Sequence, residues 1–225
     1  GKAQTVRLYG IRGSGDPIIV SSGDGGWIHL GPYVAEFLAA KGFFVLGFDS
    51  KAYLKSFTSG STTLSPQDEP GDYRALAEYA ARGSEKRVIL IGVSEGAGLS
   101  VLAATDPETK PTIAGVISLG LPDLNELGWR FRDSLIYLTH GVPNEPTFST
   151  AAIVDRVSPI PRAASHSTHA EFVPLTEVQR IMEVAGEPKK LWIVEAANHR
   201  FSDKLPEYGQ RLLEAIDWVR QHEIK

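Results

Sequence analysis

The residues best suited to chemistry form the stretch Gly92-Val93-Ser94-Glu95-Gly96. It follows a short apolar run, residues 88–91, that is typical of a buried strand, and it precedes small residues that favour a helix. A sharp turn from strand to helix lifts the serine out of the sheet and leaves the amide of Glu95 at a helix N-terminus, where it stabilises negative charge. The pattern predicts a nucleophilic serine for acyl transfer. The alternative is a glycine-rich turn in which Ser94 only caps the helix.

An acyl-transfer serine needs a general base, and His199 is the best placed of the six histidines. It follows the apolar run 191–196 and precedes the last helical pattern, so it falls on a loop at the same edge of the sheet as Ser94. We therefore interpret His199 as the base. The alternative is a loop histidine that caps the final helix.

The tetrahedral intermediate of acyl transfer needs N–H donors for its oxyanion, and the amide of Glu95 is one. The run Gly23-Asp24-Gly25-Gly26 follows an early strand and predicts the other, because glycines let the backbone approach a substrate closely. We favour the amide of Asp24, with that of Gly25 as the neighbouring option. The chain has no glycine pattern of the kind that binds phosphates.

Strand and helix patterns alternate along the chain, which predicts one α/β domain over residues 1–225 with a mostly parallel sheet and helices on both faces. The predicted strands are 5–11, 17–22, 43–48, 88–91, 113–119, 161–165 and 191–196. The predicted helices are 29–41, 73–82, the one after Ser94, 175–185 and 205–222. Residues 51–71 are expected to form a polar loop.

Residues 124–157 do not alternate cleanly, and we expect a short cap-like insertion over the strand ends. We expect four aromatic residues to line the substrate site: Trp27 after the glycine run, and Trp129, Phe131 and Tyr137 in the insertion. Ordinary packing on the sheet is the alternative for each of them.

Composition excludes several classes of function. The formal net charge is -4 and the basic residues are scattered, which argues against a nucleic-acid partner. Cysteine is absent, and no apolar run is long enough to be a transmembrane segment. His166, His169 and Glu171 have weak metal-ligand spacing, and we favour a structural role for them, so no metal and no cofactor is expected.

Four stretches make the sequence resemble the α/β-hydrolase superfamily and, more narrowly, the bacterial virulence protein VirJ/AcvB family near the dienelactone-hydrolase-like branch. They are SGDGGW at 22–27, VLGFDS at 45–50 with Tyr53, the turn around Ser94, and NHRF at 198–201. The resemblance implies a single α/β-hydrolase domain and a serine esterase. Members related to AcvB are associated with hydrolysis of lysyl-phosphatidylglycerol in the bacterial periplasm, which implies a small-molecule or lipid ester, with a peripheral membrane substrate among the options.

The chain departs from that family after the serine turn and after Tyr53. Gly98 stands where the family usually has an aspartate, and Leu54 and Lys55 replace an aromatic pair. These differences affect the implied substrate and leave the implied fold unchanged.

The resemblance also implies an acid that orients the histidine, in a stretch like HG-x-x-D-x-x-VP. This chain reads HSTHAEFVP at 166–174, so Ala170 occupies the position of the aspartate. Three interpretations remain: Glu171 serves instead, Asp123 at the end of the preceding strand serves, or the acid is lost and a Ser94–His199 dyad remains. We favour the dyad. The competing function is a binding or assembly protein that keeps the hydrolase fold.

Overall fold

The computed structural model describes residues 2–130 and 145–224. Its centre is a sheet with the strand order β1-β3-β2-β4-β5-β8-β9. The strands are β1 (Val6–Tyr9), β2 (Pro17–Ser21), β3 (Phe44–Phe48), β4 (Val88–Val93), β5 (Ile113–Leu119), β8 (Arg162–Ser167) and β9 (Lys189–Val194). β1 pairs with β3 in antiparallel fashion and every other pairing in this sheet is parallel. The predicted mostly parallel sheet is confirmed.

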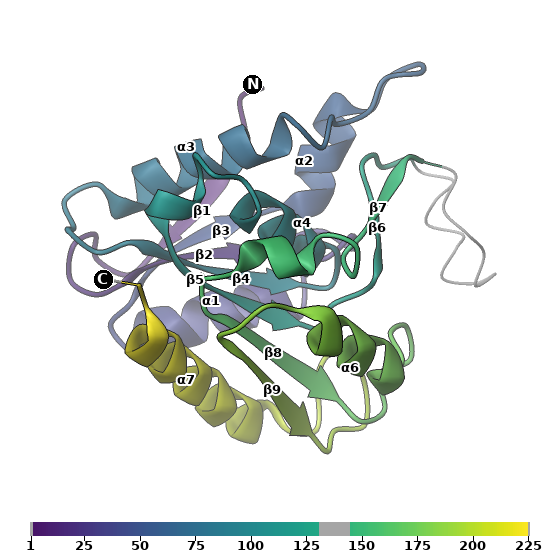
Figure 1. Ribbon diagram of the computed structural model, residues 1–225. Helices are drawn as coiled ribbons and strands as arrows, with labels where there is room; N and C mark the ends of the chain where they lie inside the picture. Colours follow the sequence, from purple (N-terminus) through teal and green to yellow (C-terminus); the bar gives the residue numbers. More distant parts are fainter. Residues whose placement is uncertain (1, 131–144, 225) are drawn as a thin grey trace.

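Helices cover both faces of the sheet (Figure 1). α1 (Leu30–Ala40) and α7 (Leu205–His222) pack on one face of the sheet and form one apolar core with it. α3 (Glu69–Ala81) and α4 (Glu95–Ala104) pack on the other face, and α6 (Leu175–Val184) packs there against β8 and β9. Strands β2 to β5 are buried along their whole length, as their continuous apolar runs require.

The segment 51–71, expected to be a loop, contains a helix. α2 (Ser50–Phe57) begins directly after β3, and the Asp49 carboxylate caps it by accepting a 3.0 Å hydrogen bond from the amide of Ala52. α3 also begins earlier than predicted, at Glu69. The serines and threonines that suggested a loop lie mostly between these two helices.

The described part of the insertion forms a short hairpin of β6 (Leu124–Glu126) and β7 (Thr147–Ser149), which lies beside α4 at the right of Figure 1. The buried Asn125 fixes this hairpin to the chain on either side of it. Its amide nitrogen donates to the carbonyl of Pro122 at 3.2 Å and to the hydroxyl of Thr150 at 2.8 Å. The hairpin is thus held at the carboxyl end of β5.

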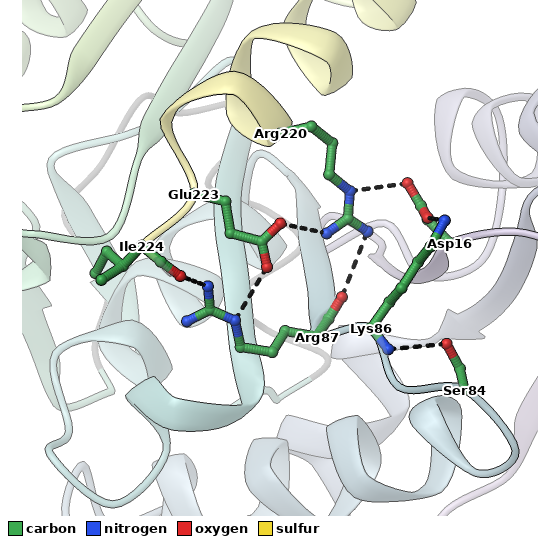
Figure 2. A network of polar contacts seen from close by, with 7 residues as sticks. All are labelled: Asp16, Ser84, Lys86, Arg87, Arg220, Glu223 and Ile224. Atoms are coloured by element: carbon green, nitrogen blue, oxygen red, sulfur yellow. Dashed lines mark hydrogen bonds and ion pairs between the residues drawn. The ribbon is translucent and has the colours of Figure 1, made fainter.

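A network of charged side chains joins the end of α7 to the sheet at the amino-terminal ends of β2 and β4 (Figure 2). Arg220 on α7 pairs with Asp16 at 2.8 Å and with Glu223 at 2.9 Å, and Glu223 also pairs with Arg87 at 3.0 Å. Lys86 completes the network by pairing with Asp16. These contacts secure the last helix to the starts of β2 and β4, far from the strand ends that carry the predicted chemistry.

Candidate active site

Ser94 occupies a sharp corner between β4 and α4. Its backbone has φ 50° and ψ −118°, a conformation that residues with a side chain rarely adopt, and its amide donates a 2.8 Å hydrogen bond to the carbonyl of Leu119. Such strain is a feature of functional sites. The predicted strand-turn-helix geometry around Ser94 is present.

The two glycines of the turn are required by close contacts. A Cβ at Gly92 would lie 2.3 Å from the Cα of Ala97, and a Cβ at Gly96 would lie 2.4 Å from the carbonyl oxygen of Ser22. Both contacts are with backbone atoms that have no freedom to move aside. The spacing of glycines around Ser94 is therefore dictated by packing of α4 against β4 and the end of β2.

His199 lies on the loop after β9, and its side chain is seated against the end of β5. The residue is 8% exposed. Its imidazole lies directly over Gly120, where a Cβ would come within 2.2 Å of the ring carbon Cε1. The ring of Phe172 meets the imidazole edge to face, with 6.0 Å between the ring centroids. The imidazole is thus positioned by backbone on one side and by an aromatic ring on another.

Ser94 and His199 line the same cavity, of about 620 Å³, at the carboxyl ends of the strands. Ligands bind at this edge in open α/β sheets. Among the described residues no hydrogen bond joins the Ser94 hydroxyl to the imidazole, a contact that is often formed only when substrate is bound. Ser94 and His199, which are far apart in the sequence, thus face one shared space.

Burial controls the basicity of His199. Loss of solvent, followed by the neighbouring His166, lowers the pKa of His199 to about 4, and the carboxylate of Glu171 acts in the opposite direction. Arg200 lowers the pKa further. The imidazole is therefore neutral at physiological pH, which is the state that a general base needs.

Asp123 does not orient His199. Its carboxylate accepts hydrogen bonds from the hydroxyl of Ser149 at 2.7 Å and the amide of Ala151 at 2.9 Å, and it pairs with Arg180 at 2.6 Å. Partial burial opposes ionisation, but these contacts together hold the pKa of Asp123 below its usual value. The structure therefore corrects the interpretation of Asp123 as the acid, because this carboxylate joins the hairpin to α6.

Glu171 contacts the backbone of His199 instead of its ring. Its carboxylate accepts a 2.8 Å hydrogen bond from the His199 amide, and the Nδ1 atom of His199 is buried without a partner among the described residues. Ala170 offers no polar side-chain atom to fill that role. Among residues 2–130 and 145–224, therefore, no carboxylate bonds the imidazole, and the Ser94–His199 dyad stays a prediction.

The residues predicted to supply the oxyanion donors, Glu95, Asp24 and Gly25, line the same cavity as Ser94. The amide of Glu95 is the first of α4 and has no partner within the helix. The loop 23–26 passes close by, since a Cβ at Gly23 would lie 3.4 Å from that of Ser94. Burial raises the pKa of Asp24, and hydrogen bonds to its carboxylate from the amides of Gly25 and Asp24 itself oppose that rise. Both candidate amides of this loop therefore lie close to the Asp24 carboxylate.

The cavity wall beside Ser94 is acidic. Asp24, Glu95, Glu126 and Glu177 line it. Burial, and then the charges of Asp24 and Glu126, raise the pKa of Glu95 well above its ordinary value, although its carboxylate accepts a 2.8 Å hydrogen bond from the Glu126 amide. Mutual repulsion of this kind is relieved when a cation enters.

Neither tryptophan expected at the substrate site lines the cavity. Trp27 packs its ring against Gly47, where a Cβ would lie 2.4 Å from the ring, and its Nε1 donates to the hydroxyl of Tyr9 at 3.1 Å. Trp129 is buried in the apolar core, with the Nζ of Lys51 4.3 Å from its ring centroid. The prediction is wrong for both residues. The other two, Phe131 and Tyr137, lie outside the described residues.

Three exposed apolar side chains form the rim of the cavity instead. Ile28 is 51% exposed, Leu124 is 45% exposed and Phe172 is 47% exposed, and all three line the cavity. They come from the β2–α1 connection, from β6 and from the β8–α6 connection. Sequence reasoning missed them because single apolar residues in three separate loops carry no periodic signal.

Comparisons with known proteins bear on the family and the fold of the chain. Residues 17–128 match the family described as "Bacterial virulence protein (VirJ)", a range that includes the loop 23–26 and the Ser94 turn. No curated protein matches the chain.

Several solved structures that are similar to the chain are described as ester hydrolases or α/β hydrolases. MGS-MChE2, an α/β-hydrolase enzyme from the metagenome of lagoon sediments at Mar Chica, Morocco, is 16% identical with a TM-score of 0.70 over 98% of this chain and 96% of that one. Monoacylglycerol lipase from Paleococcus ferrophilus is 17% identical with a TM-score of 0.64, over 99% and 100% of the two chains. The esterase domain of a Rhodothermus marinus protein is 18% identical with a TM-score of 0.64, over 98% and 94%. At such identities the likeness establishes the fold.

Proposed function

Because this chain belongs, through residues 17–128, to the VirJ family and has the α/β-hydrolase fold, we propose that it hydrolyses carboxylic esters through an acyl-enzyme on Ser94. The observation that carries the proposal is the shared cavity of a strained serine and a buried, neutral histidine. His199 takes the proton of the Ser94 hydroxyl as the serine oxygen attacks the ester carbonyl, and it returns that proton to the departing alcohol. Water then attacks the acyl-enzyme with the same histidine as base, which releases the acid and restores Ser94.

The amide of Glu95 is one donor to the oxyanion. The second donor in this proposal is the amide of Asp24, or that of the adjacent Gly25. Either amide lies close to the Asp24 carboxylate, so it has to be freed from that group before it can donate to the substrate oxygen. Loss of one oxyanion donor typically lowers the rate by about 10²–10³.

We further propose that the preferred substrate is a lipid-like ester with a cationic acyl group. Burial raises the pKa of Asp24, and burial with the neighbouring carboxylates raises that of Glu95, so an ammonium group next to Ser94 would help both groups to ionise and would be bound by them. The apolar rim suits a lipid portion at the mouth. Lysyl-phosphatidylglycerol, which the family resemblance implies, combines both features. No helix among residues 2–130 and 145–224 is long and apolar enough to cross a bilayer.

A serine-reactive fluorophosphonate tests the hydrolase proposal. The native protein is expected to be labelled, and labelling is expected to disappear in Ser94→Ala and to persist in Ser14→Ala, a serine far from the cavity on the β1–β2 connection. A native protein that takes up no label supports the competing function, a binding or assembly protein. The orphaned Nδ1 of His199 is the observation that keeps this second function open.

Substrate preference is tested with nitrophenyl esters and an aminoacylated phospholipid. Lysyl-phosphatidylglycerol is expected to be hydrolysed faster than the same lipid with both lysyl amines acetylated, because acetylation removes the positive charges and keeps the ester. Equal rates for the two lipids contradict the cationic preference and leave the esterase proposal intact.

A further inference from the structure

A second buried histidine, His166, lies at the carboxyl end of β8 and has a defined tautomer. Its side chain is fully buried, and its Nε2 lies 3.0 Å from the carbonyl oxygen of Val173. A carbonyl oxygen only accepts hydrogen bonds, so Nε2 of His166 must carry the hydrogen. Burial lowers the pKa of His166 and keeps the ring neutral, although the contact with Val173 opposes that effect. Its Nδ1 is therefore an acceptor with a free lone pair.

His166 and His199 are held together by the three-residue segment 171–173. Glu171 accepts from the backbone amide of His199, the ring of Phe172 packs on the His199 imidazole, and the Val173 carbonyl accepts from His166. The strand ends bring the two histidines together as well. Gly120 lies against the His199 ring. Its amide donates a 3.1 Å hydrogen bond to the carbonyl of Ser165, the residue immediately before His166.

The two imidazoles have complementary unsatisfied atoms. The Nδ1 atoms of His166 and His199 are both buried, and neither has a hydrogen-bond partner among the described residues. A buried polar atom without a partner is costly, so each needs one. When His199 acts as base, its Nε2 must be free of hydrogen and its Nδ1 must carry one. Its Nδ1–H is then a donor without a partner, and the Nδ1 of His166 is an acceptor without one.

We propose that His166 is a positioning residue that selects the tautomer of His199, in the role that a carboxylate has in serine triads. The Nδ1–H of His199 donates to one bridging water, and that water donates to Nδ1 of His166, while the Nε2–H of His166 remains on the Val173 carbonyl. One bridging water satisfies both buried atoms, and such a bond is nearly as favourable as a direct one. No proton leaves His166 in this scheme, because it acts through His199 and does not touch the substrate.

The inference rests on the proposed hydrolase function, and it has a chemical consequence. A neutral imidazole orients His199 as a carboxylate does, but it gives little charge stabilisation to the imidazolium that forms during attack by Ser94. The enzyme is expected to be slower than one with a complete triad, and an aspartate at position 170 is expected to raise its turnover.

Nitrogen-15 NMR of histidine-labelled protein tests the tautomers directly. In the native protein His199 is expected in the Nδ1–H form and His166 in the Nε2–H form. His166→Phe, which keeps an aromatic ring and removes the acceptor, is expected to shift His199 toward the Nε2–H form. The matched control is His169→Phe, an exposed histidine three residues further on, which is expected to leave the tautomer of His199 unchanged.

Kinetics supplies the second readout. His166→Phe is expected to lower kcat by at least about tenfold with KM unchanged, which is less than the loss of about 10⁴ found when a triad carboxylate is replaced. Adding Ala170→Asp to His166→Phe is expected to restore kcat, since a carboxylate again accepts from Nδ1–H. A defect caused by misfolding would not be rescued in this way.

The possible failures are distinguishable. An Nε2–H tautomer of His199 in the native protein overturns the inference even if His166→Phe does not fold, and so does a His166→Phe variant with native tautomer and kcat. If Ser94 is not labelled by the fluorophosphonate but His199 has the Nδ1–H form, the hydrolase proposal fails and the pairing of the two histidines stands.

Discussion

The backbone amide of His199 donates a 2.8 Å hydrogen bond to the carboxylate of Glu171. This contact fixes the loop that carries the base, and it brings a negative charge near the imidazole without a bond to the ring. Orientation of the loop and orientation of the ring are therefore separate tasks in this site. Glu171 performs the first, and the second falls to other groups.

The pH dependence of ester hydrolysis is expected to have an unusually acidic midpoint. Burial and the neighbouring His166 lower the pKa of His199 to about 4. A base acts when it is neutral, so kcat/KM is expected to be fully present above this pKa and to fall as the pH drops through about 4. Circular dichroism at each pH distinguishes loss of activity from unfolding.

Two variants near the imidazole should move that midpoint in opposite directions. Glu171→Gln keeps an acceptor for the His199 amide and removes the charge that raises the pKa, so the midpoint moves to lower pH. Arg200→Gln removes a charge that lowers the pKa, so the midpoint moves to higher pH. A native midpoint near about 6.5, the ordinary value for histidine, would show that the imidazole is not buried as described.

Asp123→Ala is expected to lower the free energy of unfolding by about 1–2 kcal/mol, because charge-assisted hydrogen bonds to the hairpin and to α6 are lost. The rate of fluorophosphonate labelling at Ser94 is expected to stay unchanged, since the Asp123 carboxylate contacts Ser149, Ala151 and Arg180. Chemical denaturation and the labelling rate measure the two effects. Collapse of labelling in a folded Asp123→Ala protein would return the role of acid to Asp123.

Gly98→Ala is expected to destabilise the protein by about 1–3 kcal/mol through overpacking. A Cβ at position 98 would lie 1.8 Å from Oδ1 of Asn125, and the buried Asn125 side chain cannot move without breaking its bonds to Pro122 and Thr150. This steric cost exceeds the gain of about 1 kcal/mol from replacing glycine by alanine in a helix.

A double-mutant cycle gives the decisive control for Gly98. In an Asn125→Ala background the obstructing side chain is gone, so Gly98→Ala is expected to become neutral or stabilising. An effect of the same size in both backgrounds would mean that Asn125 is not the residue that requires glycine at position 98.

Neutralising the acidic wall should change which substrates are preferred. Asp24→Asn is expected to reduce kcat/KM for an ester with a cationic acyl group and to leave a neutral ester of the same shape nearly unaffected, because Asn keeps the size of the side chain and loses the charge. The ratio of the two kcat/KM values, measured in native and variant protein, is the readout. The matched control is Asp203→Asn, a carboxylate on the His199 loop that does not line the cavity. An unchanged ratio in Asp24→Asn would argue against an ammonium subsite.

Local patterns explain how much of this architecture could be predicted from sequence. The conformation of the Ser94 turn could be predicted because it depends on residues that are close in sequence. A helix can fold back so tightly on its strand only with glycine at positions 92 and 96. α2 was predictable in principle, since Asp49 is a good N-cap and Leu54 and Phe57 follow at helical spacing, but the serines and threonines around them favoured a loop.

The rest depends on contacts between distant segments. Nothing near Trp27 in the sequence indicates that its ring packs on Gly47 instead of on a substrate. The acceptor state of His166 follows from its contact with Val173, which arises only when the β8–α6 connection folds back over the strand. The spacing of these residues in the chain carries no such information.

Gly120 takes no part in the reaction, yet the His199 ring packs directly on its Cα. Each of the nineteen other encoded amino acids has a Cβ, which would occupy the space of the ring, so every missense change at this codon is expected to displace the imidazole. Random mutagenesis screened for esterase activity should therefore return position 120 as intolerant as Ser94 itself, and a survey of reactive side chains alone would overlook it.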